Sequence, residues 1–214
     1  MEKVFLQVLP LAVAGAVSPT GLLFVMMILS GKDNPNRKAL SFVIGSTVFL
    51  IVLGIFVGYT YKSAVHTASR PKLISAVVDI GLGLLILAIV IRSVFLEKKE
   101  KPAKERKWKI PYLLVGFMYM IINISTLIPF IAAIKVIADD KLESGDNLFL
   151  FAAVLVITMF MIAFPVVITF LAPKSSERIL GPVKTFMSKH GSQIADVYFA
   201  LMAVYLILKG ISAV

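Results

Sequence analysis

Six long apolar segments dominate the chain and restrict what it can fold into. They run over residues 4–29, 39–61, 73–96, 110–138, 148–171 and 192–214. Each reaches the length of about 20 residues that a helix needs to cross roughly 30 Å of bilayer hydrocarbon. A helix satisfies its own backbone hydrogen bonds in lipid, so we predict an all-α integral membrane protein with six transmembrane helices.

The overall composition supports this class. Hydrophobic residues make up 59% of the 214 residues and charged residues 16%, whereas soluble domains have roughly 45–50% and about 25%. A soluble domain with this composition would expose large apolar patches. The six segments and their connections use nearly all of the chain, so we expect a single transmembrane domain over residues 1–214. The first segment continues into further spans, and we therefore expect no removable signal peptide.

Basic residues gather between the apolar segments and account for the formal net charge of +10. Fourteen Lys and Arg follow the first, third and fifth segments, and six lie on the opposite side. The positive-inside rule therefore predicts a multi-pass protein of the plasma membrane with both termini outside and the basic stretch 97–109 in the cytoplasm. Since no basic-aromatic motif is present, we expect no nucleic-acid partner.

The two halves of the chain, residues 1–96 and 110–214, resemble each other on either side of the basic linker. In each half, a Ser in the first helix lies fifteen residues before an Asp, and an Asp in the third helix lies thirteen residues before a basic residue. Three helices per half is an odd number, so the halves would enter the membrane from opposite sides. Such inverted repeats are common in transporters, whose substrates bind near the midplane at broken helices. The matching pairs are Ser18–Asp33 with Ser125–Asp140, and Asp79–Arg92 with Asp196–Lys209.

Polar residues beside a proline interrupt the first and fourth segments. Proline lacks a backbone donor and disrupts the helical ladder one turn back, so we expect helices one and four to be broken at Ser/Thr-Pro motifs. Freed carbonyls and hydroxyls would then be available to a ligand. The alternative is a pair of structural kinks whose hydroxyls bond to their own helices. The predicted substrate-binding residues are Ser18, Pro19, Thr20, Asn123, Ser125, Thr126 and Pro129.

Two carboxylates lie inside apolar segments, where charge is costly and usually functional. Asp79 lies about one turn inside the third segment and Asp196 about one turn inside the sixth. They would either couple or gate transport by handling a proton or cation, or cap the starts of their helices, where the dipole favours acids. Lys135 lies four residues before Asp139, and we expect it to extend outward to the interface.

Several kinds of chemistry have no support in the sequence. The chain has no cysteine, which excludes disulfides and thiolate metal sites, and its two histidines show no metal-ligand spacing. Nucleotide-binding loops, nucleophile elbows and the HExxH motif are also lacking. We therefore predict a protein that is not an enzyme and uses neither a metal nor a cofactor.

These residues resemble a known superfamily. The break at Ser18 and Pro19, the basic loop GKDNPNRKA and the glycine-bearing second helix are similar to the LysE superfamily of exporters. The basic middle loop and the closing stretch KHGSQIADVYFALMAVYLILKG look most like its GAP family, the Sap-like lipid-addressing proteins. The resemblance implies a six-helix inverted repeat and export of a solute or lipid. The stretch ISTLIPF stands where amino-acid exporters carry an Asn-Pro-Lys-like element, which argues against amino-acid export.

We therefore expect a transporter or exporter of a lipid, a lipid-linked molecule or a small polar solute, working by alternating access around the two breaks. Its partners would be membrane lipids and the transported molecule, with homo-oligomer formation left open. One alternative is a cation or metal ion exporter that uses Asp79 and Asp196. Another is a non-transporting membrane partner protein in which the broken helices are packed shut.

Overall fold

The computed structural model describes residues 1–31, 33–67, 71–95, 110–140 and 143–212, and every regular element in these ranges is an α-helix. The prediction of an all-α protein is therefore confirmed for this part of the chain. The basic linker 97–109 lies outside the described residues. The helices are α1 (Glu2–Ala16), α2 (Pro19–Leu29), α3 (Pro35–Thr67), α4 (Pro71–Phe95), α5 (Tyr112–Ile122), α6 (Ile124–Asp139), α7 (Ser144–Leu171) and α8 (Ser176–Ile211).

Four helices, α3, α4, α7 and α8, are long and apolar enough to cross a membrane. The other four form two bent pairs, with 50° between α1 and α2 and 76° between α5 and α6, and each pair can supply one further span. Large side chains such as Phe56, Phe160 and Leu171 are exposed on the outer faces, as expected where lipid surrounds the protein. The protein is thus a multi-pass membrane protein with four to six candidate spans.

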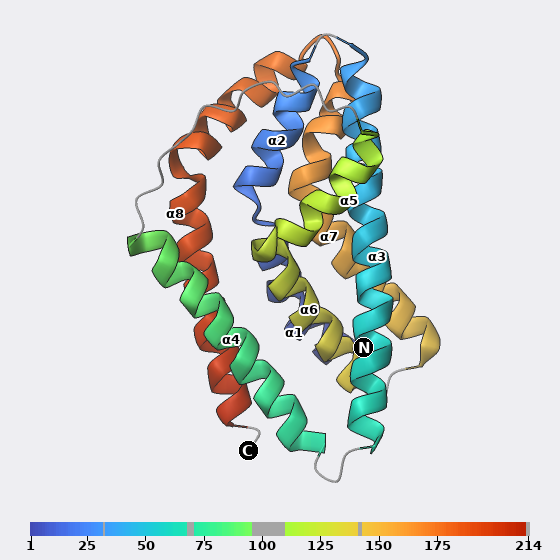
Figure 1. Ribbon diagram of the computed structural model, residues 1–214, viewed down its shortest axis with the longest axis vertical. Coiled ribbons are helices and arrows are strands. Elements are labelled where there is room, and N and C mark those ends of the chain that lie inside the picture. Colours follow the sequence, from blue (N-terminus) through green and yellow to red (C-terminus); the bar gives the residue numbers. More distant parts are fainter. Residues whose placement is uncertain (32, 68–70, 96–109, 141–142, 213–214) are drawn as a thin grey trace.

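The helices alternate in direction between the two ends of the molecule. Figure 1 shows the ends of α2 and α7 near one end, while the end of α3, the start of α4 and the end of α8 lie at the other. In the same view α4 runs alongside α8. Glycines allow these two helices to touch, since a Cβ on Gly83 would lie 3.0 Å from the Ala203 carbonyl oxygen and a Cβ on Gly210 would lie 2.9 Å from that of Ala76.

The closest backbone approach joins α3 to α5. A Cβ on Gly116 would collide with the carbonyl group of Phe42, and a Cβ on Gly45 with that of Leu113. The Ser46 hydroxyl donates a hydrogen bond to the Gly116 carbonyl oxygen at 3.1 Å. Small residues commonly allow such close packing between helices in membranes.

Replacing Gly116 by alanine is expected to lower stability by about 1–3 kcal/mol, because the added methyl group forces α5 away from α3. The thermal unfolding midpoint of the purified protein in detergent measures this loss. Gly81→Ala is the matched control, since a Cβ there has no described heavy atom within 4 Å. Equal midpoints for the two variants would contradict the proposed close contact.

Two boundaries differ from the sequence prediction. The fourth segment breaks at Asn123 and not at the Ser/Thr-Pro motif itself, and Pro129 lies inside α6. A proline removes the hydrogen bond to the carbonyl four residues earlier. Here that carbonyl belongs to Ser125, which lies inside α6, so the proline alone does not account for the break at Asn123. The helix that contains the sixth predicted segment starts at Ser176, because residues 176–191 are also helical and continue into the segment without a break.

Candidate functional site

The first break lies at Val17 and Ser18, where the backbone leaves the helical conformation. Val17 has φ −71° and ψ 85°, and Ser18 has φ −129° and ψ 78°. Pro19 then opens α2 at its first position, where its fixed φ suits a helix start and its missing N–H costs nothing. The Ser18 backbone N–H donates to the Met161 sulfur at 3.3 Å, so the break is bound to α7.

The second break consists of Asn123, with φ −84° and ψ 65°, between α5 and α6. Its side-chain amide is almost fully buried and makes three hydrogen bonds. The Asn123 Nδ2 donates to the Thr126 Oγ1 at 2.9 Å and to the Ser18 Oγ at 3.1 Å. The Asn123 Oδ1 accepts a hydrogen bond from the Ser125 hydroxyl at 2.8 Å.

Ser18, Asn123, Ser125 and Thr126 therefore form one polar group, which we call the junction cluster. Ser18 and Thr126 are fully buried, and Ser125 is partly exposed. The Ser18 and Ser125 hydroxyls bond to Asn123 and not to the backbone of their own helices, unlike Thr47, which bonds to the carbonyl four residues earlier. The structure thus brings two breaks that are about half the chain apart into direct contact.

Aromatic side chains cover one side of the junction cluster. The Tyr119 ring stacks on Phe24 with 5.5 Å between centroids and packs against Phe42 at 5.4 Å. Its hydroxyl lies 3.3 Å from the Thr20 Oγ1, so Thr20 joins the site through Tyr119, while its own side chain is exposed. Tyr119 was not among the residues predicted from the sequence, because its contacts with α2 depend on the bend between α5 and α6.

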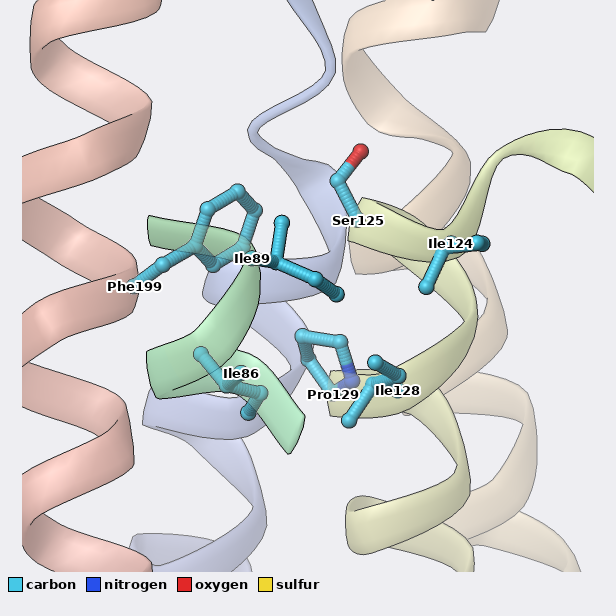
Figure 2. Close-up of a pocket in the computed structure, with 7 residues that line it drawn as sticks. All are labelled: Ile86, Ile89, Ile124, Ser125, Ile128, Pro129 and Phe199. Atoms are coloured by element: carbon cyan, nitrogen blue, oxygen red, sulfur yellow. The ribbon is translucent and has the colours of Figure 1, made fainter. Parts of the chain in front are cut away.

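A small apolar hollow adjoins the cluster on the side of α4 and α8. Figure 2 shows Ser125 and Pro129 at its wall together with residues of three helices. Its lining side chains are hydrocarbon apart from Ser125, whose hydroxyl points away from the others in Figure 2, so a ligand there would present an apolar surface. The lining residues are Ile86 and Ile89 of α4, Ile124, Ser125, Ile128 and Pro129 of α6, and Phe199 of α8.

The two predicted carboxylates do not cap helix starts. Asp79 is two turns inside α4, which begins at Pro71, and Asp196 lies in the middle of α8, which begins at Ser176. The capping alternative was therefore wrong, because both helices extend further toward their N-termini than the apolar segments do. Asp196 is partly buried, and its Oδ2 accepts a hydrogen bond from the Ser192 hydroxyl at 3.3 Å.

Lys135 does not extend outward, which corrects the prediction made from its spacing to Asp139. Its ammonium group lies 2.6 Å from the Asp79 Oδ2, and both side chains are almost fully buried. It also donates to the Ser75 carbonyl oxygen at 3.1 Å. Lys135 therefore pairs with Asp79 of α4 more closely than with Asp139 of its own helix. A buried ammonium group needs a carboxylate within reach.

The fold and the site define a helical, multi-pass membrane protein whose two broken helices meet at a buried polar cluster. A family model described as Sap, sulfolipid-1-addressing protein, matches residues 8–212, so the chain belongs to this family. The expected likeness to Sap-like proteins is thereby confirmed, while membership of the LysE superfamily stays a prediction. No curated protein and no solved structure matches the chain significantly.

Proposed function

We propose that this protein exports a lipid, a lipid-linked molecule or a small polar solute by alternating access. The observation that carries the proposal is the hydrogen bond between Asn123 and Ser18. A substrate site shared by two broken helices requires both breaks at one place, and the polar groups freed there can bind cargo. The description of the family as sulfolipid-1-addressing favours a lipid among these cargoes.

The helix contacts support an inverted repeat caught in one state. In such a repeat α1 corresponds to α5 and α2 to α6, so the pairs α1–α6 and α2–α5 would be equivalent. α1 packs closely along α6, whereas no Cα atoms of α2 and α5, both fully described, lie within 8 Å of each other. The described contacts between α2 and α5 are made by side chains, with Tyr119 stacked on Phe24. This difference is expected of a transporter that is closed at the α1–α6 side and able to open at the α2–α5 side.

The distribution of basic residues supports an orientation for this state. The ends of α2 and α7 lead into the basic connections (Figure 1), which belong in the cytoplasm by the positive-inside rule. The closed α1–α6 side would then face outward, with both termini outside the plasma membrane. Cargo would enter from the cytoplasm past Tyr119 and leave at the far end.

Two other functions stay in competition. The buried carboxylate of Asp79 supports a cation exporter, although the described residues contain no group of three or more His, Asp or Glu side chains placed to hold a metal ion. A non-transporting membrane partner is the other candidate, and it would keep the junction cluster closed at all times.

The double variant Ser18→Ala/Ser125→Ala tests the proposed site. We expect it to insert normally and to lose export, because it removes one hydroxyl from each break. Mass spectrometry would compare cells expressing wild type, the variant and empty vector, measuring polar metabolites and metals in the medium and lipids on the outer leaflet. An outer-leaflet lipid, a polar species or a metal enriched only with wild type identifies the class of cargo.

Ser30→Ala is a matched control for that experiment, since the Ser30 hydroxyl bonds only to the Met26 carbonyl oxygen of its own helix among its described contacts. It should export as wild type does. Full export by the double variant would overturn the proposed site. Equal export by wild type and empty vector would favour the non-transporting partner.

A further inference from the structure

The buried ion pair between Asp79 and Lys135 lies well away from the junction cluster. Twelve residues of α6, about 18 Å of helix at 1.5 Å per residue, separate Lys135 from Asn123. Each side chain of the pair is 1–2% exposed. Two charges inside a membrane protein cost more than apolar contacts between the same helices, so the pair calls for a reason beyond holding α4 against α6.

The two partners are bound unequally. The Lys135 ammonium has the Asp79 Oδ2 at 2.6 Å and the Ser75 carbonyl oxygen at 3.1 Å. Asp79 has only the ammonium, because its Oδ1 is buried without a hydrogen-bond partner among the described residues. One oxygen of the buried Asp79 carboxylate therefore has no described partner, and the other is paired with Lys135.

A second carboxylate offers Lys135 another partner one turn along its own helix. The Asp139 Oδ2 lies 4.0 Å from the Lys135 ammonium and is about one-third exposed. Hydrogen bonds from the Ser75 hydroxyl at 2.7 Å and the Tyr61 hydroxyl at 3.1 Å hold the Asp139 carboxylate in place. A small rotation of the lysine side chain would therefore exchange a buried partner for one near the surface.

Other ionisable groups face the pair from the surrounding helices. Tyr61 of α3 lies beside Lys135, with the ammonium 5.9 Å from the centre of its ring. Tyr205 and Lys209 of α8 are within electrostatic range of Asp79. Lys209 is partly buried and is attracted by Asp79. It is therefore a second cation near this carboxylate.

We propose that Asp79 is the proton-binding site that couples transport, with Lys135 as a tethered cation that the proton displaces. A proton from water adds to an Asp79 carboxylate oxygen and forms an O–H bond, while Lys135 keeps its own proton and moves to Asp139. Loss of the proton restores the pair seen here. The proposal rests on the transport function inferred above, and it assigns the coupling role to Asp79 and not to Asp196.

The helix packing gives this exchange a mechanical consequence. α4 makes its main contacts with α8 and only a few with α6, and the ion pair is one of the few. At Gly83 and Gly210 the backbones of α4 and α8 pack directly against each other. Displacing Lys135 from Asp79 therefore frees α4 and α8, as one unit, from the outer end of α6.

Two measurements on the purified full-length protein in lipid nanodiscs test the proposal as the pH is lowered. Infrared difference spectra should show a carboxylic acid C=O band that is absent in Asp79→Asn and retained in Asp79→Glu. Spin labels at Leu73→Cys and Asp140→Cys should move apart in acid, since the chain has no native cysteine and both positions are exposed. In Asp79→Asn, which mimics the protonated residue, the labels should be far apart at every pH.

Control labels at Leu85 of α4 and Leu201 of α8, both exposed, should keep their distance throughout. Asp196→Asn, at the equivalent position of the other half, should keep the band and the movement. An unchanged band in Asp79→Asn, or a distance between residues 73 and 140 that does not respond to pH in wild type, would overturn the proposal. Since neither measurement uses cargo, the result is independent of the export experiment on Ser18 and Ser125.

Discussion

Replacing Lys135 by methionine will destabilise the protein by about 3–5 kcal/mol, because it leaves the Asp79 carboxylate buried without its partner. Asp79 has no hydrogen bond among the described residues to compensate for the loss. Methionine has nearly the length of the lysine stem, so packing against α6 is retained and charge is the main change. Equilibrium unfolding of the purified protein in detergent, followed by circular dichroism, measures the difference.

The reverse change, Asp79→Asn, should cost less, because Lys135 retains the Ser75 carbonyl oxygen and has Asp139 within 4.0 Å. The double variant Asp79→Leu/Lys135→Met should recover most of the stability, since replacing a buried ion pair by apolar residues of similar volume is often neutral. Together with the single variant Asp79→Leu, Lys135→Met and this double variant form a double-mutant cycle that isolates the pairwise term. Additive losses would show that the pair contributes no interaction energy.

The sequence was sufficient where the decisive physics is local. A run of apolar residues long enough to span hydrocarbon must be helical, and α3, α4 and α7 match the predicted segments apart from a few residues at their ends. The first break was also predictable, because Pro19 removes a backbone donor whatever surrounds it. The resemblance to Sap-like proteins rested on the same local features, and the family match over residues 8–212 agrees with that part of it.

Lys135 shows where local reasoning stops. Its spacing to Asp139 led to the prediction that it extends outward to the interface. Asp79, however, lies 56 positions earlier and reaches Lys135 only after α4 packs on α6. The junction cluster has the same origin, since Ser18 and Asn123 are 105 positions apart. The paired breaks were a signal that these residues meet, and the position of the second break six residues before Pro129 followed only from the structure.

Loss of the Asn123 amide is the change expected to damage the junction cluster most. Among the described residues, Asn123 is the one whose side chain bonds residues of both breaks, so Asn123→Ala leaves the buried Ser18 and Thr126 hydroxyls without that partner. An unsatisfied buried group costs about 1–3 kcal/mol, whereas Ser125 is partly exposed and can turn to water.

We therefore expect Asn123→Ala to lower stability by about 2–4 kcal/mol, because two buried hydroxyls each lose one hydrogen bond. We also expect it to abolish export, even at a temperature where the variant is folded. Unfolding in detergent and the cargo measurement on whole cells separate the two effects. Asn36→Ala, at the start of α3, is the matched control and should change neither. Asn123 holds the two breaks together through its hydrogen bonds. Full export by the variant would therefore mean that cargo does not pass between the breaks. The hollow beside Pro129 would then be the next place to test.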